Sequence, residues 1–467
     1  MHEGRNKRLG MLLAATALVL PGMAMAETPR EAELAARLER LEAEMAQLRA
    51  DLQAAKAQGT QAAMTADAAA TRSEQVAAQV ATLEAKPAPA SSDGFKAGPT
   101  TIRLGGYIKL IAANTRYSDG EVATNSLGRD FYLPQAIPTG NGPSSRVQDF
   151  TAKQSRFWLN FATDVGGHSV KGYLETDFQT SPGTQGSQRT TNGYNLALRR
   201  AYMQFDRWTI GQDWTTFQYT GALPESTDYL GGAEGTVFVR QPLVRYSAPL
   251  GDGMTLHISA ENPESGTATL GTATLIENGD DSMPDFAARL AYVGAPGELS
   301  LAGLARQVRV DNAGVADSVA GWGVSGAGKL YLDDDKSSDL RFMATYGHNI
   351  GRYVGLNFAP DAVFDPATGK LGSVRTFAAL AALRIALAPR LRANLMGSFQ
   401  RVSYAGSLSR LGLAGYNRQA WSGAANLFYS PMKNVDLGIE YRHGERELVS
   451  GAQGALDRVE FAAKYSF

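Results

Sequence analysis

The chain has 467 residues, and its 45 Lys and Arg almost balance its 46 Asp and Glu, so no global field would attract a nucleic acid. It contains no Cys, which excludes disulfides, thiolate metal sites and cysteine nucleophiles. After residue 26 no apolar run is long enough to cross a bilayer as a helix, and Gly is abundant at 50 residues. This composition suits either a transmembrane β-barrel or a soluble all-β protein.

Residues 1–26 combine the features of a secretory signal peptide. Arg5, Lys7 and Arg8 precede a short apolar stretch, and the small residues of Ala24-Met25-Ala26 follow it. The apolar stretch is too short to anchor the chain in a membrane. We therefore expect cleavage after Ala26, which places the mature chain outside the cytoplasm.

Residues 27–86 carry a helical repeat in which apolar residues alternate at spacings of four and three. Such an a/d seam predicts a parallel, homo-oligomeric coiled coil, although one seam does not fix the number of helices. Gly59 and Ser73 weaken the seam, and a solitary charged helix is the alternative. Pro87 and Pro89 then end the helix and open a linker over 87–100. The seam residues are Leu34, Leu38, Leu41, Met45, Leu48 and Leu52, continued by smaller residues as far as Leu83.

From residue 101 onward the apolar residues recur at every second position, the period of a β-strand. This period predicts sixteen strands, at roughly 101–114, 153–163, 169–179, 195–206, 207–213, 239–247, 253–261, 284–293, 297–310, 319–331, 338–350, 374–387, 389–404, 417–430, 433–446 and 456–467.

The connections between these strands are alternately short and long. The longer, polar segments are 115–152, 180–194, 214–238, 262–283, 311–318, 351–373, 405–416 and 447–455. Membrane barrels sort their connections in this way, with tight periplasmic turns and long outer loops, whereas a soluble sandwich has no reason to do so. We therefore predict an all-β transmembrane barrel of 16 antiparallel strands over 101–467, with the coiled coil in the periplasm.

The last eleven residues, 457–467, alternate between an apolar, aromatic face and a charged face, and they end on Phe467. This pattern is similar to the closing strand of outer-membrane β-barrels, which the barrel-assembly machinery reads. The resemblance implies that this machinery is a partner of the chain.

In a barrel, one face of each strand meets lipid and the other lines the lumen. A cation that faces hydrocarbon at mid-membrane costs roughly 2–4 kcal/mol, so the cationic face must be the inner one. Arg199 cannot share a face with its neighbour Arg200, and we expect it near a rim or at a subunit contact. The cations expected along a pathway for anions are Arg103, Lys109, Arg156, Lys171, Arg200, Arg245, Arg289, Arg341, Arg384, Arg392 and Arg442. The acids expected to face inward with them are Glu175, Asp177, Glu261, Asp436, Glu440 and Glu460.

The basic excess of this face predicts a channel that favours small anions, and the alternative is that the arginines pair with acids only to remain satisfied. The segment 214–238 is the third long loop, the one that folds into the lumen in general porins. Its Glu225, Asp228 and Glu234 would then oppose the arginines near 156, 200 and 245. A loop that lies outside the lumen is the alternative.

Six motifs lie in the first third of the barrel. They are Gly105-Gly106-Tyr107-Ile108-Lys109, Ser155-Arg156-Phe157, Lys171-Gly172-Tyr173-Leu174-Glu175-Thr176-Asp177-Phe178, Leu198-Arg199-Arg200-Ala201-Tyr202, Ile210-Gly211-Gln212-Asp213-Trp214 and Gln241-Pro242-Leu243-Val244-Arg245-Tyr246. These motifs resemble the trimeric outer-membrane porins of the DcaP-like family. The resemblance implies a homotrimer, a periplasmic coiled coil and the uptake of small anions such as dicarboxylates.

Two other functions compete with a channel. An outer-membrane hydrolase would need a nucleophile beside a base, and His257 with Ser259 is the best pair that the sequence offers. A structural tether would use the barrel as a plug and the coiled coil to reach the cell wall. Asp333-Asp334-Asp335 could bind Ca²⁺, but a solvated turn is the simpler interpretation. We expect no enzyme activity, metal or cofactor.

Overall fold

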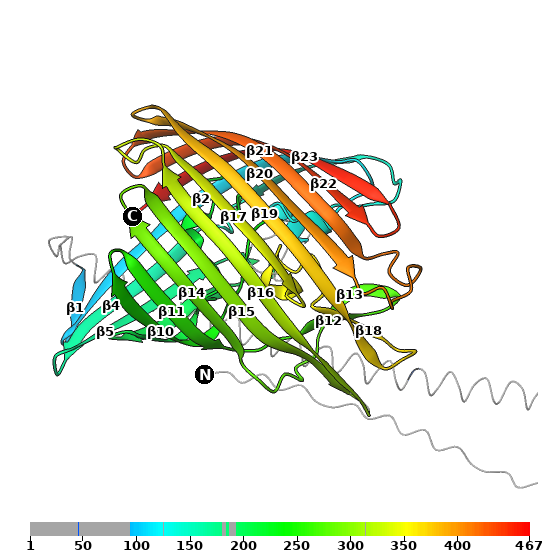
Figure 1. Ribbon diagram of the computed structural model, residues 1–467. Coiled ribbons are helices and arrows are strands. Elements are labelled where there is room, and N and C mark those ends of the chain that lie inside the picture. The colour runs from blue at the N-terminus through cyan, green and yellow to red at the C-terminus, as the bar shows by residue number, and fades with distance from the viewer. Residues whose placement is uncertain (1–44, 46–93, 125, 180–183, 186–192, 313) are drawn as a thin grey trace, which may run out of the picture. The chain divides into compact units, whose positions relative to one another are not determined.

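A computed structural model of the chain describes residue 45 and residues 94–124, 126–179, 184–185, 193–312 and 314–467. The predicted signal peptide, coiled coil and most of the linker lie outside the described residues. From residue 94 onward the chain forms a closed antiparallel β-barrel (Figure 1). Among the described residues, no helix is both long enough and apolar enough to cross a membrane.

The barrel has sixteen strands, which confirms the predicted number. β3 and β4 both pair with β2 and together form one strand that is interrupted at 152–155. In chain order the strands are β2 (Thr100–Tyr117), β3 (Ser145–Thr151) with β4 (Arg156–Val165), β5 (His168–Asp177), β8 (Ala197–Phe205), β9 (Trp208–Trp214), β10 (Arg240–Gly251), β11 (Met254–Glu261), β14 (Asp285–Gly294), β15 (Gly297–Asn312), β16 (Val315–Tyr331), β17 (Asp339–His348), β19 (Lys370–Ala388), β20 (Leu391–Tyr404), β21 (Asn417–Met432), β22 (Val435–Leu448) and β23 (Gln453–Ser466).

The other described elements are short and lie in the connections. They are the strands β1 (Phe95–Ala97), β6 (Thr184–Gln185), β7 (Gly193–Tyr194), β12 (Gly266–Thr269), β13 (Thr272–Glu277) and β18 (Ala362–Asp365), the helix α2 (Leu127–Asp130) and the 3₁₀ turns η1 (Pro134–Ala136), η2 (Thr220–Ala222) and η3 (Gly351–Tyr353).

Side chains alternate across the barrel wall as the period of two predicts. Leu104, Leu395 and Ile439 are 60%, 63% and 51% exposed on the outer face. Lys109 and Glu440, on the same strands as Leu104 and Ile439, are 8% and 2% exposed on the inner face. The apolar outer surface is the side that a bilayer can solvate.

Asp333-Asp334-Asp335 lies in the turn between β16 and β17, and hydrogen bonds within the turn stabilise it. The Asp333 carboxylate accepts hydrogen bonds from Ser337 N (2.7 Å), Ser337 Oγ (2.8 Å) and Ser338 N (2.9 Å). The backbone N–H of Ser337 in particular lowers the pKa of Asp333 from its ordinary value. Asp333 therefore caps the turn, and its carboxylate oxygens accept hydrogen bonds from donors within the turn.

The barrel closes where β23 pairs with β2, and Phe467 extends this seam by one residue. Its backbone exchanges two hydrogen bonds with Gly106, of 3.1 and 3.0 Å, and its ring lies 6.1 Å from that of Phe157. A Cβ atom on Gly106 would come within 2.6 Å of Arg156 O and 2.9 Å of the Phe467 ring. Gly106 is therefore required for the close approach of three chain segments.

We predict that Gly106→Val weakens this seam, because a backbone oxygen cannot move away as a flexible side chain can. The folded barrel should lose its resistance to SDS at a markedly lower temperature, as measured by heat-dependent mobility in SDS–PAGE. Gly303→Val on β15 is the matched control, since a Cβ there meets nothing within 4 Å. Equal transition temperatures for the two variants would contradict this account of the seam.

Candidate functional site

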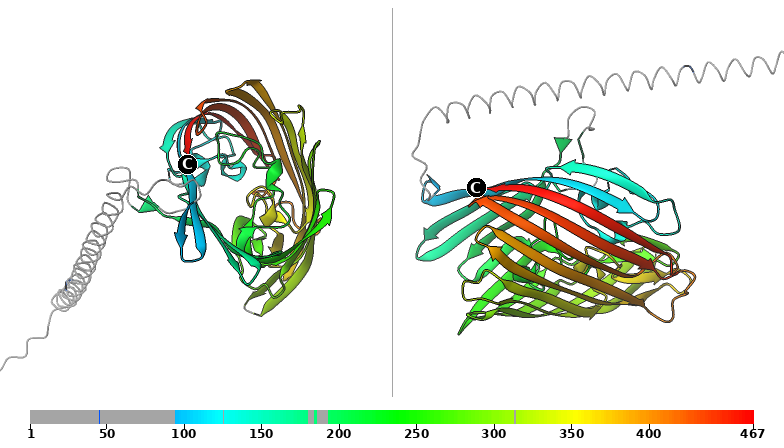
Figure 2. Two further views of the ribbon diagram at one scale, coloured as in Figure 1. Left: turned by 90° about the vertical axis from the view of Figure 1, so that its left-hand side faces the viewer. Right: turned by 90° about the horizontal axis from the view of Figure 1, so that it is seen from above.

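The connection between β9 and β10 lies inside the barrel, and we call residues 215–238 the lumen loop. Lys109 Nζ of β2 donates to Thr227 O (2.6 Å), and Arg341 of β17 donates to Leu223 O (2.5 Å). Ser226 Oγ donates to Glu440 of β22 (2.6 Å). Because these strands lie in different sectors of the barrel, a single loop can contact them all only by crossing the interior (Figure 2, left).

The glycine-rich end of the lumen loop packs directly on the wall. A Cβ on Gly235 would come within 2.4 Å of the Ala379 backbone of β19, and Gly235 N donates to Ser398 Oγ of β20 (2.8 Å). Glycine at this position lets the loop backbone touch the strands with no side chain between them.

A second segment, residues 349–361, also lies inside the barrel, and we call it the second lumen segment. Val237 and Val354 form an antiparallel bridge, Phe238 N donates to Tyr353 O (2.9 Å), and Gly355 N donates to Thr236 O (3.0 Å). The length and polarity of 351–373 predict an outer loop, and for residues 351–361 this prediction is wrong. The apolar residues of this segment are buried because they pack against the lumen loop.

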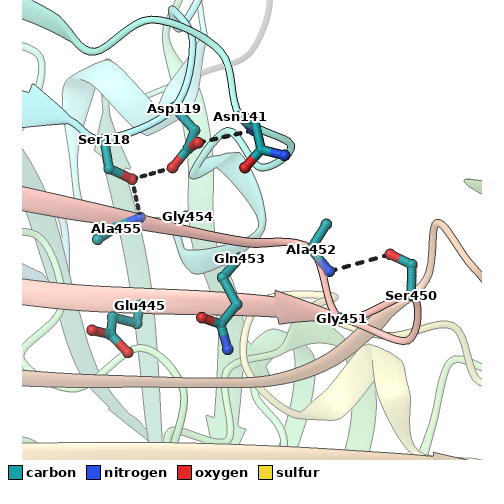
Figure 3. Close-up of a pocket in the computed structure, with 10 residues that line it drawn as sticks. All are labelled: Ser118, Asp119, Asn141, Glu445, Ser450, Gly451, Ala452, Gln453, Gly454 and Ala455. Atoms are coloured by element: carbon teal, nitrogen blue, oxygen red, sulfur yellow. Dashed lines mark hydrogen bonds between the residues drawn. The ribbon is translucent and has the colours of Figure 1, made fainter.

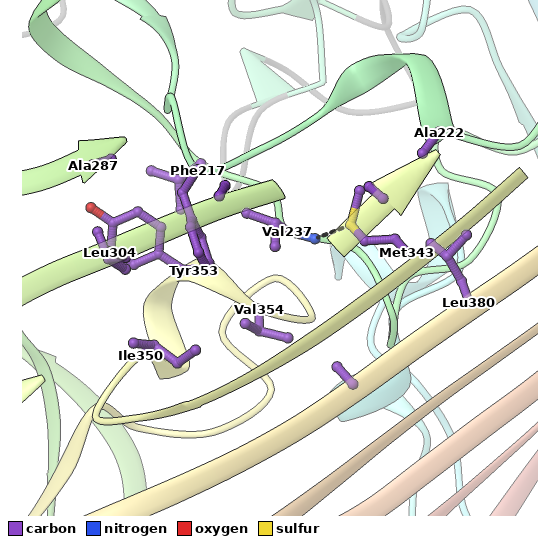
Figure 4. Packing of buried hydrophobic residues seen from close by; sticks show 14 residues of the cluster. Phe217, Ala222, Val237, Ala287, Leu304, Met343, Ile350, Tyr353, Val354 and Leu380 are labelled. Carbon is purple, nitrogen blue, oxygen red and sulfur yellow. Dashed lines mark hydrogen bonds between the residues drawn. The ribbon is translucent and has the colours of Figure 1, made fainter. Parts of the chain in front are cut away.

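Apolar side chains from the two segments and the wall form a cluster inside the barrel (Figure 4). Phe217, Ile350 and Tyr353 are 1%, 0% and 0% exposed. Leu304 and Met343 extend into this cluster from inward positions, where alternation alone predicts polar residues. Each fully buried large side chain contributes about 1.5–3 kcal/mol, so the cluster holds both segments firmly against the wall.

A buried ion-pair network anchors the second lumen segment at its end. Arg306 of β15 lies 2.8 Å from Asp361 and 3.3 Å from Asp285, and all three side chains are fully buried. Tyr353 Oη donates to Asp285 (2.7 Å) and accepts from Gln241 Nε2 (2.9 Å). Arg306 is not among the residues predicted from sequence, because its inward position gives no sign that it meets a loop.

Five arginines from β4, β8 and β10 gather on one sector of the inner wall, and we call them the arginine wall: Arg156, Arg199, Arg200, Arg240 and Arg245. Arg156 lies 3.0 Å from Glu175 and 2.8 Å from Asp177. Arg200 and Arg245 share Asp213 at 2.6 and 2.5 Å. Three carboxylates therefore compensate only part of the positive charge of the five guanidinium groups.

Arg199 and Arg200 are consecutive, yet both ion-pair with inward-facing acids. Glu175 of β5 pairs with Arg200, and the next residue, Thr176, pairs with Leu198, so Arg199 has no partner in the ladder. This β-bulge lets two neighbouring residues point to the same face. Arg199 lies 2.7 Å from the fully buried Asp177. The expectation that Arg199 cannot share a face with Arg200 is therefore wrong, and Arg199 lies near the loop-side end of β8.

Tyr229 of the lumen loop is the centre of the arginine wall. Its hydroxyl accepts from Arg156 (2.9 Å), and the Arg156 and Arg199 guanidinium carbons lie 5.5 and 5.8 Å from its ring centroid. Arg240 stacks on Trp214 at 3.7 Å. Arg240 forms no ion pair with any residue that the structure describes, and the rings of Trp214 and Phe238 lie against its guanidinium group.

The three carboxylates predicted for the lumen loop lie elsewhere. Glu225 lies 2.6 Å from Arg392 and 3.6 Å from Arg384, on β20 and β19. Asp228 accepts from Tyr132 N (2.9 Å), and Glu234 accepts from Tyr132 Oη (2.6 Å) and from Ser422 Oγ (2.9 Å). None of them contacts Arg156, Arg200 or Arg245, which corrects the expected placement. The loop meets that wall with Tyr229 because nearer donors already satisfy its acids.

The other predicted cations differ in their surroundings. Arg289 donates to Gln218 O, Arg341 lies 2.6 Å from Asp339, and Arg442 lies 2.8 Å from Glu440. Arg103 and Lys171 are exposed near the short-turn ends of β2 and β5. Arg458, which the sequence analysis did not select, is 2% exposed and donates to Thr115 Oγ1 (2.8 Å) and to Gly128 O (2.7 Å).

The candidate hydrolase pair does not form. His257 Nδ1 lies 2.8 Å from Ser247 Oγ, whereas Ser259 Oγ donates to Glu261 (2.7 Å). No three His, Cys, Asp or Glu side chains among the described residues are placed to hold a metal ion.

A recess of about 670 Å³ lies among the connections after β2 and β22 (Figure 3). Asp119, on its edge, accepts from Ser118 Oγ (2.5 Å) and Asn141 N (2.9 Å), and Ser118 Oγ accepts from Ala455 N (2.7 Å). Its polar groups therefore hold the loops to one another.

Comparison with known proteins agrees with this architecture. The crystal structure of the outer membrane channel DcaP of Acinetobacter baumannii is 27% identical, with a TM-score of 0.65, and the match covers 80% of this chain and 100% of that chain. OmpT of Vibrio cholerae, folded in vitro, has the same fold at 10% identity, with a TM-score of 0.50, 81% of this chain covered and 100% of that chain. A search of the curated proteins gave no match. The family model of the DcaP outer membrane protein matches residues 79–467, and the chain therefore belongs to this family.

Proposed function

We propose that this protein is an outer-membrane diffusion channel that favours small anionic solutes, with dicarboxylates as the expected class. The observation that carries the proposal is the arginine wall beside the lumen loop, where four guanidinium groups share Glu175, Asp177 and Asp213 and the fifth, that of Arg240, stacks on Trp214. A pore wall with excess positive charge lowers the energy of a passing anion and raises that of a cation.

The lumen loop brings the solute close to this wall. On one side of the loop Tyr229 contacts Arg156, and on another Glu225 contacts Arg392 and Arg384. A solute that carries two carboxylates can exchange part of its hydration for the planar donor forks of arginines, which match carboxylate geometry. The fixed acids hold Arg156, Arg199, Arg200 and Arg245 in place, while the excess positive charge remains available to the solute.

Arg240→Gln provides a clean test, because it removes a cation without leaving a carboxylate unpaired. One charge acting at about 8 Å through water is worth about 0.5 kcal/mol, so the anion-to-cation permeability ratio should fall roughly twofold. Reversal potentials of single channels in a KCl gradient measure this ratio. Arg156→Ala should lower it further, since Glu175 and Asp177 each lose one of their two cationic partners.

Arg375→Gln on the outer face of β19 is the control, because it removes the same charge from an exposed position. A permeability ratio that changes as little for Arg240→Gln as for this control would overturn the assignment of anion preference to the arginine wall.

We also propose that the mature protein is a homotrimer in the outer membrane, with residues 27–86 as a periplasmic coiled coil that reaches toward the cell wall. The heptad seam and family membership support this assembly. Phe467, at the barrel seam, would be read by the assembly machinery. Chemical cross-linking should yield trimers of the mature chain, and removal of 27–86 should lower their yield.

A further inference from the structure

A recess of about 460 Å³ lies beside the loop-side ends of β20 and β21, far along both strands from their short turns. Three guanidinium groups line it, those of Arg401, Arg410 and Arg418. Arg418 lies 2.7 Å from Glu447. Neither Arg401 nor Arg410 forms an ion pair with a residue that the structure describes. Three cations and one anion therefore share a small exposed volume.

The position of Arg401 relates this recess to the membrane. Arg401 pairs across the strands with Phe377 and Gln419, and one step nearer the membrane centre Phe399 pairs with Trp421. Further along the same outer face, Leu395 and Leu427 are 63% and 40% exposed. Outer-membrane barrels place aromatic residues at the boundary between hydrocarbon and headgroups, with apolar residues between the two boundaries. Arg401 therefore lies at the level of the headgroups.

The loop-side end of a membrane barrel faces the cell exterior. The headgroups at this level belong to the outer leaflet, which in bacterial outer membranes consists largely of phosphorylated glycolipid. Arginine forks bind phosphate oxygens in pairs, and such charge-assisted hydrogen bonds are stronger than neutral ones. Ser403, which also lines the recess, adds a hydroxyl donor.

We propose that Arg401, Arg410 and Arg418 form a binding site for a phosphate group of an outer-leaflet glycolipid. The acyl chains of this lipid would lie along the apolar outer face of β19–β21, past Phe399 and Trp421. Glu447 holds Arg418 in position and leaves the charge of the other two arginines for the phosphate. The site lies on the outer surface and is independent of solute passage through the lumen.

The test compares the full-length barrel with Arg401→Gln/Arg410→Gln/Arg418→Gln. After delipidation in detergent, each protein is titrated with diphosphorylated lipid A, with its dephosphorylated form and with inorganic phosphate, and binding is followed by native mass spectrometry. We expect wild type to bind the diphosphorylated lipid, and the triple variant to bind it at least about tenfold more weakly, since several charge-assisted hydrogen bonds are lost.

The matched control is Arg207→Gln/Lys336→Gln/Arg390→Gln, which removes the same charge from exposed positions in the short turns. Its lipid affinity should equal that of wild type. Equal affinity of the Arg401 triple variant and wild type would overturn the proposal, and so would equal binding of the dephosphorylated lipid. If inorganic phosphate alone binds with the same affinity as the lipid, the ligand of this site is free phosphate and not a glycolipid. Should the triple variant fail to fold, Arg401→Gln alone gives the same comparison.

Discussion

Replacement of Arg306 by Leu should lower the free energy of unfolding by about 3–5 kcal/mol, the cost of removing one partner from a buried ion-pair network. Asp285 and Asp361 would stay buried without their cation. The second lumen segment would lose its anchor at Asp361, so single-channel conductance should also rise and become noisier. Urea unfolding followed by tryptophan fluorescence and planar-bilayer recordings measure the two effects.

Arg309→Leu, on the same strand, is the control. Arg309 pairs with Asp311, and both side chains remain partly exposed, at 32% and 48%, so the loss should be below about 1 kcal/mol. An unfolding free energy for Arg306→Leu within 1 kcal/mol of this control would show that the network does not hold the segment. If Arg306→Leu does not fold, Asp361→Asn tests the same anchor.

Replacement of Glu225 by Gln should increase anion preference, the opposite direction to Arg240→Gln. Glu225 pairs with Arg392 and Arg384, which keep Asp436 and Asp339 as partners, so its neutralisation adds one net positive charge to the lumen. By the same Coulomb estimate the anion-to-cation permeability ratio should rise roughly twofold. The weaker contact with Arg392 also removes one of the restraints on the middle of the lumen loop, and we expect brief closures in single-channel traces.

Asp311→Asn is the control, because it also neutralises an acid paired with an arginine, but at an exposed position. An unchanged or lower permeability ratio for Glu225→Gln would show that the pair with Arg392 does not contribute to selectivity.

The barrel could be predicted from the sequence because the alternation of side chains along each strand is a local pattern. Ile439 faces outward and Glu440 inward in β22, and a period of two in eight or ten residues suffices to assign both faces. The sorting of connections by length then supplied the topology. None of this requires knowledge of which residues meet across the interior.

The parts that the sequence did not predict depend on long-range contacts. The bulge that turns Arg199 inward arises from the pairing of β8 with β5, and period alone cannot indicate it. Met343 and Leu304 are apolar on an inner face because the lumen loop and the second lumen segment pack on them. Ile350 and Val354 could have indicated that this long connection is buried, because apolar residues are not stabilising in an exposed loop.

The interior apolar cluster also affects where ions can travel. It covers the sector from β14 to β19, and a dry, apolar sector offers an ion nothing in exchange for its hydration shell. At the level of this cluster we therefore expect ions to pass along the other sectors, whose inner side chains bear charge. A solute confined to those sectors would pass close to their charged side chains even in a wide barrel.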